Sequence, residues 1–259
     1  MSIVAADTVR FLKNRLRYGW AVIRKPAICD YFGVKIPMST TPALERARRR
    51  IYLGVYEHDE LGAVKKLVRA NDIVVEIGAG CGVVSTAIAQ KLSDSRNLHC
   101  FEANPALLDS LQAVMKANNV RPNVTIAAVG TVAGDMELFC SEDFLSSSLV
   151  RRDGHTTSQM VRVISFDELM AHIRPTLLLM DVEGAEKDLL SGEIPDSVQT
   201  IIAELHPHVV GNKAISRIVQ NLVAQEFNIL LDLSNERVMV FSRMAGSDSL
   251  CARKSTLAG

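Results

Sequence analysis

The alternation of short apolar runs with longer helix-like segments, which begins at residue 73, constrains this chain more than any other feature. Segments with apolar residues at helical spacing lie at 83–92 and 105–118, each between two apolar runs. Because parallel strands need long crossover connections, usually helical, this order predicts an α/β domain. We expect a Rossmann-like, mostly parallel sheet with helices on both faces. The predicted parallel strands span residues 73–77, 98–102, 124–129, 176–180 and 200–205.

The two ends of the chain differ from this core. Residues 227–233 and 237–242 are separated by a short polar turn and predict an antiparallel C-terminal strand pair. Three regions follow from these patterns: an N-terminal helical extension, the alternating domain and a polar, Ser-rich tail that we expect to be disordered. They span residues 1–58, 59–243 and 244–259.

The N-terminal extension contains a basic segment, 4–25, with apolar residues at helical spacing. Such a helix can lie on an anionic membrane surface. The alternative, which we favour, is that its short apolar stripe packs on the core or on a second subunit. Prolines at 26, 37 and 42 predict a loop, and helices are expected again at 44–56 and 59–70.

Composition limits the classes of partner. The 259 residues contain 29 Lys plus Arg and 29 Asp plus Glu, so no net charge favours nucleic acid, and we predict no such partner. The five cysteines form no CxxC pair, which indicates reduced thiols. Because neither a membrane-spanning run nor a secretion signal is recognisable, we expect a cytoplasmic protein.

The segment from Glu76 to Gly82, EIGAGCG, follows the first strand and opens a helix. Glycines there allow a tight turn and a close approach of the backbone to a ligand, and the helix N-terminus offers free N–H groups. A dinucleotide-binding loop typically has the pattern GxGxxG. Here the third glycine comes one residue early, and Val83 stands where that pattern has its third glycine. This spacing favours S-adenosylmethionine over NAD.

Glu102 ends the second strand, within FEANP. A carboxylate at this position can accept hydrogen bonds from both hydroxyls of a ribose. The alternative is a surface or helix-capping carboxylate. Both S-adenosylmethionine and NAD contain ribose, so Glu102 supports nucleoside binding but does not distinguish between these two cofactors.

Five segments resemble the FkbM-type methyltransferase family, in the same order along the chain. They are VYE at 55–57, SSSL at 146–149, VISFDEL at 163–169, LMDVEGAE at 179–186 and IAELH at 202–206. The chain departs from the family at Cys81, where Asn is common, and at Met180, where Lys is common. The resemblance implies a class I methyltransferase fold, S-adenosylmethionine as methyl donor and O-methylation of sugars or natural products.

The predicted cofactor contacts combine the glycine loop, the acidic strand end and the family segments. They are Glu57, Glu76, Gly78, Ala79, Gly80, Gly82, Glu102, Ala103, Asn104 and Asp181.

Catalytic candidates follow the fourth and fifth strands, because ligands of open α/β sheets bind at the carboxyl ends of the strands. They are Asp181, Glu204 and His206, with His206 as the first choice for general base because its ordinary pKa, about 6.5, suits neutral pH. The alternative for His206 is a structural residue before Pro207. Asp181, Glu183 and Glu204 offer oxygen ligands for a divalent cation. We predict no metal, since these carboxylates also fit helix caps.

The leading hypothesis is an S-adenosylmethionine-dependent O-methyltransferase that acts on a sugar or another small hydroxylated molecule. Alternatives are methylation of an amine, a lipid or a protein on the same fold, an NAD-dependent oxidoreductase and a non-catalytic binding module. The oligomeric state stays open.

Overall fold

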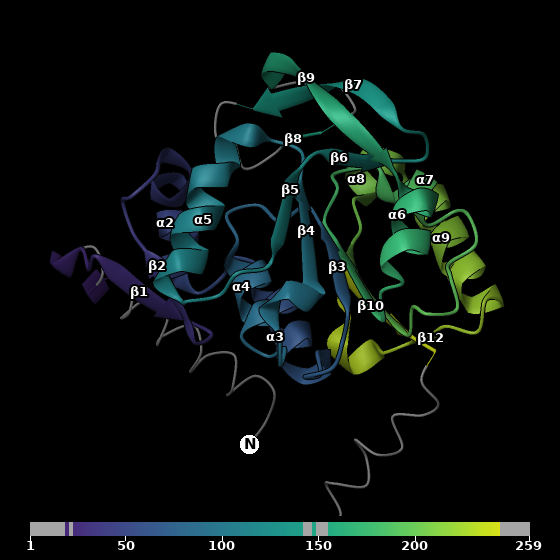
Figure 1. The fold of residues 1–259 in the computed structure, drawn as a ribbon, viewed down its shortest axis with the longest axis horizontal. Helices are drawn as coiled ribbons and strands as arrows, with labels where there is room; N and C mark the ends of the chain where they lie inside the picture. Colours follow the sequence, from purple (N-terminus) through teal and green to yellow (C-terminus); the bar gives the residue numbers. More distant parts are fainter. Residues whose placement is uncertain (1–18, 21–22, 142–146, 149–154, 244–259) are drawn as a thin grey trace, which may run out of the picture.

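The computed structural model describes residues 19–20, 23–141, 147–148 and 155–243. Its centre is a seven-stranded sheet in the order β12-β13-β11-β10-β3-β4-β5 (Figure 1). The strands from β11 to β5 are parallel, and β13 is antiparallel to both β11 and β12. The Rossmann-like sheet and its antiparallel C-terminal pair are confirmed. The strands are β3 (Val74–Ile77), β4 (Leu98–Glu102), β5 (Asn123–Ile126), β10 (Leu177–Met180), β11 (Thr200–Glu204), β12 (Asn228–Ile229) and β13 (Val238–Ser242).

Helices cover both faces of this sheet (Figure 1). Successive strand residues point to opposite faces, so Val74 packs into one core and Val75 into the other. This is why the central strands read as continuous apolar runs. The first face carries α2 (Pro42–Leu53), α3 (His58–Leu67), α4 (Val83–Ala89) and α5 (Leu108–Ala117). The second carries α6 (Phe166–Ile173), α7 (Glu186–Leu189) and α9 (Asn212–Ala224), and α8 (Pro207–Val210) follows β11.

A second sheet lies beyond the carboxyl ends of the central strands (Figure 1). Its order is β6-β9-β7-β8, with β6 at Ala128–Gly130, β7 at Gly134–Ser141, β8 at Ser147–Ser148 and β9 at His155–Ser165. The single strand predicted over 124–129 is wrong, because the chain leaves the central sheet at Ala127. There the Ala127 N–H donates to the Glu102 carbonyl, and the next residues pair with β9.

The predicted loop at 26–42 is also wrong, because it contains the hairpin β1 (Ile28–Tyr31) and β2 (Val34–Pro37). Phe32 and Gly33 both have positive φ, as a tight hairpin turn requires. The buried side chains of Tyr31, Val34 and Ile36 join the core under α2 and α5. The 4–25 helix and the 244–259 tail fall mainly or wholly outside the described residues.

The expected helix at 44–56 is α2, which begins two residues earlier. Thr41 caps its start, and Gly54, in the left-handed region, ends it. None of the helices in the described part of the chain has the length and apolar composition that a bilayer crossing requires.

Candidate active site at the carboxyl ends of the central strands

The glycine loop connects β3 to α4 and packs tightly against its neighbours. A Cβ on Gly78, whose φ is +91°, would lie 2.0 Å from the backbone oxygen of Asp181. A Cβ on Gly82, φ +81°, would lie 3.0 Å from Cα of Leu111 in α5. Glycine at these two positions lets β10 and α5 approach the loop, and it fixes where the loop N–H groups point.

Glu102 holds the glycine loop to the end of β4. Its Oε2 accepts a hydrogen bond from the Gly80 N–H at 2.8 Å, and its Oε1 accepts one from the Asn104 N–H at 2.8 Å. Burial raises the pKa of this carboxyl to about 7, even though these N–H groups favour the charged form. Each oxygen has a further lone pair for a ligand hydroxyl, because a carboxylate can accept about four hydrogen bonds.

An open cleft of about 790 Å³ lies between the glycine loop and the second sheet. Of the predicted cofactor contacts, it is lined by Glu57, Gly78, Gly80, Glu102, Ala103 and Asp181. The other four lie just behind the surface of the cleft or away from it. They are Glu76, Ala79, Gly82 and Asn104.

Two of these four residues, Glu76 and Asn104, make contacts behind the surface of the cleft. The side chain of Glu76 is 1% exposed and lies beside Ser85 and Cys100, under α4. Burial raises its pKa to about 7. Asn104 accepts a hydrogen bond from the Ala106 N–H through Oδ1 and so caps the short 3-10 turn after β4. Both residues support the loop and the strand end.

The apolar wall of the cleft was not predicted from the sequence. This wall comes from the end of β4, the following turn and the second sheet. It consists of Phe101, Leu107, Ala127, Ala128, Val129 and Leu138. The only sequence signal for it was the apolar run that continues past Ile126, which we assigned wholly to one strand of the central sheet.

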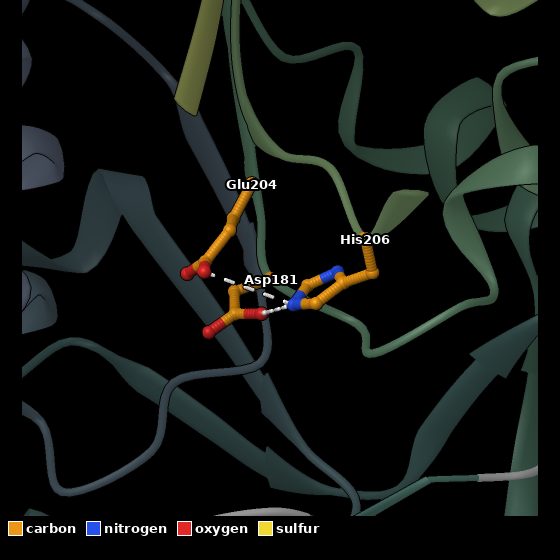
Figure 2. A group of neighbouring side chains, drawn as sticks. All are labelled: Asp181, Glu204 and His206. Atoms are coloured by element: carbon orange, nitrogen blue, oxygen red, sulfur yellow. Dashed lines mark ion pairs between the residues drawn. The ribbon is translucent and has the colours of Figure 1, made fainter. Parts of the chain in front are cut away.

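The catalytic candidates lie together, as Figure 2 shows. Nε2 of His206 is 3.4 Å from Oδ1 of Asp181 and 3.8 Å from Oε1 of Glu204. A third carboxylate, Glu183, has Oε2 at 3.7 Å from the same nitrogen. The His206 side chain is 1% exposed and lines neither the cleft nor a polar cavity beside it. Asp181 lines both, and Glu204 lines the polar cavity. His206 therefore lies behind the carboxylates that a substrate meets first.

Glu186, the last residue of DVEGAE, positions His206. Its Oε1 accepts a hydrogen bond from the backbone N–H of His206 at 2.8 Å and lies 3.4 Å from Nδ1 of the imidazole ring. Its Oε2 accepts one from the Gly184 N–H at 2.7 Å. Burial acts to raise the pKa of Glu186, but His206 outweighs it, so the carboxyl is more acidic than usual. We assigned no role to Glu186 from the sequence.

Concentrated negative charge dominates the electrostatics here. Burial, and then the neighbouring carboxylates of Glu204 and Glu183, raise the pKa of Asp181 well above its usual range. Burial acts to lower the pKa of His206, but Glu186 and the other carboxylates outweigh it and raise the pKa. Arg237 forms an ion pair with Glu204 from the exposed side.

A second, polar cavity, open to solvent, adjoins the cleft and shares Tyr56, Glu57, Asp181 and Glu183 with it. Its wall combines acidic and basic groups from α2, α3 and the ends of β10 and β11. Besides the shared residues, its charged and histidine groups are Arg50, His58, Asp59, Glu60, Glu204, His208 and Arg237. Burial raises the pKa of Glu60, which faces Glu204. The wall supplied by α3 was not predicted.

Comparison with known families identifies the class of protein that this fold and site belong to. The model of the methyltransferase FkbM domain matches residues 72–229, which is most of the chain. The chain therefore belongs to the FkbM family of S-adenosylmethionine-dependent methyltransferases. The resemblance seen in the DVEGAE and IAELH segments is confirmed, and the oxidoreductase alternative is set aside.

Several solved structures are similar at low identity, and a search of curated proteins finds no significant match. A ribosomal protein L11 methylase from Lactobacillus delbrueckii subsp. bulgaricus is 10% identical, with 73% of this chain and 78% of that chain covered and a TM-score of 0.44. A precorrin-6y C5,15-methyltransferase from Geobacter metallireducens GS-15 is 15% identical, with 67% and 71% covered and a TM-score of 0.40. Aeropyrum pernix fibrillarin with bound S-adenosyl-L-methionine is 11% identical, with 68% and 67% covered and a TM-score of 0.41. The family assignment rests on the domain match.

Proposed function

We propose that this chain binds S-adenosylmethionine in the cleft and transfers its methyl group to a hydroxyl oxygen of a small polyhydroxylated acceptor, such as a sugar. The observation that carries the proposal is the buried carboxylate of Glu102, whose two oxygens are fixed by the N–H groups of Gly80 and Asn104. This arrangement supports a ribose at Glu102. The adenine then lies against the apolar wall that includes Phe101 and Leu138.

The methionine part of the donor extends from the ribose toward Gly78 and Asp181, which line the same cleft. That direction places the sulfonium at the junction of the cleft and the polar cavity. The acceptor occupies the polar cavity, and its hydroxyl approaches the methyl carbon in line with the C–S bond. Alignment of the two reactants supplies much of the catalysis, because the sulfonium is already an activated leaving group.

The transfer forms one C–O bond and breaks the C–S bond, and S-adenosylhomocysteine leaves with the electron pair of that bond. The acceptor O–H bond also breaks, and its proton needs a base. Glu57, Asp181 and Glu183 line both cavities, so their carboxylates are placed to receive this proton. The burial of His206 favours a positioning role behind Asp181 and Glu204 over direct contact with the acceptor.

A second candidate is N-methylation, which the charge of the polar cavity favours. Glu57, Asp59, Glu60, Asp181, Glu183 and Glu204 outnumber its guanidinium groups, which belong to Arg50 and Arg237. Such a wall suits a cationic amine that is deprotonated before transfer.

The test is calorimetric titration of the full chain with S-adenosylmethionine, S-adenosylhomocysteine and NAD. It is followed by transfer of a labelled methyl group to a panel of methyl glycosides and matched amino sugars. Binding of the first two ligands and labelling of the glycosides supports O-methylation. Labelling that requires the amino group supports N-methylation, and binding of NAD alone overturns both.

A further inference from the structure

The three side chains in Figure 2 present ligand atoms toward one another from two neighbouring strands. One ligand atom from each of Asp181, Glu204 and His206 lies within 4.8 Å of the other two. Nε2 of His206 is 3.4 Å from Oδ1 of Asp181 and 3.8 Å from Oε1 of Glu204. Asp181 follows β10, Glu204 ends β11, and His206 comes two residues later. The parallel pairing of β10 and β11 holds this spacing in place.

Two of these ligand atoms are buried without a hydrogen-bond partner. They are Oδ1 of Asp181 and Nε2 of His206. A buried polar atom without a partner costs about 1–3 kcal/mol, and most such atoms in folded proteins are satisfied. The His206 side chain is almost fully buried, and its Nε2 points into a group of carboxylates. A positive charge, on the imidazole or on a bound cation, compensates this arrangement.

The other ring nitrogen of His206 faces a carboxylate that is itself fixed in place. Nδ1 of His206 faces Oε1 of Glu186 at 3.4 Å, and Glu186 is fixed by the N–H groups of Gly184 and His206. Metal-bound histidines usually direct their second nitrogen to a carboxylate, which sets the tautomer and the ring orientation. A proton on Nδ1 leaves the lone pair of Nε2 directed at Asp181 and Glu204.

The separations also fit a cation. Ligand atoms about 2.1 Å from an ion lie about 3.0–3.4 Å apart in octahedral or tetrahedral geometry. The distances of 3.4 and 3.8 Å from Nε2 are within a few tenths of an ångström of that range. Arg237 pairs with the same Oε1 of Glu204 from the exposed side, and this oxygen keeps a further lone pair for an ion.

We propose that Asp181, Glu204 and His206 bind a divalent cation at the junction of the cleft and the polar cavity. One imidazole with two carboxylates suits Mn²⁺ or Zn²⁺ better than Mg²⁺, which prefers oxygen ligands and keeps much of its water. This reverses our prediction of no metal. From the sequence we considered Asp181, Glu183 and Glu204 as the possible ligands. In the fold, the buried imidazole of His206 lies beside Asp181 and Glu204 and takes the place of Glu183 in the ligand set.

The role of the cation rests on the proposed O-methylation. An acceptor hydroxyl bound to the cation has a lower pKa, as metal-bound water does. The proton then passes to Glu57 or Glu183, which line both cavities and lie outside the ligand set. The cation also holds the acceptor oxygen in place while the C–O bond forms and the C–S bond breaks.

The test measures binding of Mn²⁺ alone to the metal-free full chain, with no donor or acceptor present. We expect one Mn²⁺ per chain by electron paramagnetic resonance, and electron spin-echo modulation from one imidazole ¹⁴N. Zn²⁺ is expected to displace it. Asp181→Asn and Glu204→Gln should each weaken Mn²⁺ binding at least about tenfold, and His206→Gln should also remove the nitrogen signal.

The matched control is His208→Gln, which changes a neighbouring imidazole whose ring centre is 5.7 Å from that of His206. This variant should keep both the Mn²⁺ affinity and the nitrogen signal. Thermal unfolding and S-adenosylmethionine titration on the same preparations report folding and the cofactor site separately. A folded chain that binds S-adenosylmethionine but neither Mn²⁺ nor Zn²⁺ overturns the metal site alone. Mn²⁺ binding without nitrogen modulation, or unchanged in the three variants, also overturns it.

Discussion

At the scale of single residues, Glu76 and Glu102 are buried carboxylates on neighbouring strands with different surroundings. Glu102 lines the cleft and holds Gly80 and Asn104, whereas Glu76 lies under α4. Burial raises the pKa of both to about 7. A shifted pKa therefore does not distinguish a ligand contact from a supporting residue here, and position relative to the cleft does.

This difference predicts that substitution of Glu102 weakens donor binding, whereas substitution of Glu76 leaves it almost unchanged. Glu102→Gln should weaken S-adenosylmethionine binding by about 10- to 100-fold, because hydrogen bonds to a charged group contribute about 1.5–3 kcal/mol each. Glu76→Gln should change the affinity by less than about threefold, since its side chain does not reach the cleft. Calorimetric titration of both variants decides the point. An equal loss in the two would return Glu76 to the set of cofactor contacts.

Glu76 should instead contribute to the dependence of stability on pH. Its folded pKa, about 7, exceeds the ordinary value of 4.5, so the folded state binds more protons between these values. The free energy of unfolding should then fall as pH rises from about 4.5 through 7, by about 3 kcal/mol for this group. Glu76→Gln should remove this part of the loss.

Urea denaturation at pH 5 and pH 8.5 measures the effect. The free energy of unfolding of the variant should depend less on pH than that of the wild type. At pH 8.5, relative to pH 5, the variant should be the more stable of the two. Glu193→Gln, which changes an exposed carboxylate, is the control and should behave like the wild type. A pH dependence in Glu76→Gln as steep as in the wild type would contradict the prediction.

The sequence indicated that the catalytic candidates lie together, because carboxyl ends of adjacent parallel strands meet at one edge of the sheet. Asp181, Glu204 and His206 were found in this way. The role of Glu186 was missed, since its contact with the His206 N–H depends on how α7 packs beside the residue after β11. The same limit explains why Glu60 was missed, because no pattern within the chain relates α3 to Glu204.

At the scale of elements, the glycine loop owes its form to close contacts. Gly78 and Gly33 both have positive φ, at +91° and +85°, but a Cβ on Gly33 meets nothing within 4 Å. Gly33→Ala should therefore cost about 1–2 kcal/mol, the penalty of the left-handed conformation alone. Gly78→Ala should cost at least about 2 kcal/mol more, because its Cβ collides with the backbone of Asp181.

Urea denaturation of the two variants gives the difference, and calorimetry should show donor binding lost in Gly78→Ala and kept in Gly33→Ala. Similar stabilities for the two variants would mean that β10 can move away from the loop at little cost.

The elements that the sequence predicted well are those buried on both faces. β3, β4, β10 and β11 are continuous apolar runs between helical segments. β7 and β9 were missed because they are half exposed: Thr157, Ser158 and Met160 of β9 face solvent. The hairpin β1–β2 was missed because Pro26, which lies before β1, and Pro37, the last residue of β2, are typical of loops. The hairpin is held against the end of α5, where the Lys35 N–H donates a hydrogen bond to Oδ1 of Asn118.

At the scale of the whole molecule, the second sheet closes the cleft from the side opposite the glycine loop. Leu138 of β7 is 1% exposed and belongs to the apolar wall. Leu138→Ala should lower the free energy of unfolding by about 2–5 kcal/mol and weaken donor binding, because it opens a cavity beside the adenine position. Met160→Ala on β9, at a 67% exposed position, is the control and should change neither. Denaturant unfolding and calorimetry test both variants, and unchanged donor affinity in Leu138→Ala would place the adenine elsewhere.

The cleft joins residues from Tyr56 to Ala185, so a ligand that fills it should stabilise most of the chain. At a concentration 100 times its dissociation constant, S-adenosylmethionine should add about 2.7 kcal/mol to the free energy of unfolding. For a chain of this length, each kcal/mol raises the unfolding midpoint by about 2–4 °C, so a rise of about 5–10 °C is expected. NAD should give no rise. S-adenosylmethionine at the same concentration should raise the midpoint of Glu102→Gln by only about 1–6 °C, because a 10- to 100-fold loss of affinity leaves about 0.4–1.4 kcal/mol of stabilisation. Differential scanning calorimetry measures these midpoints. A rise with NAD equal to that with S-adenosylmethionine would mean that the cleft recognises only the adenosine shared by both, and the donor selectivity inferred from the early third glycine would fail.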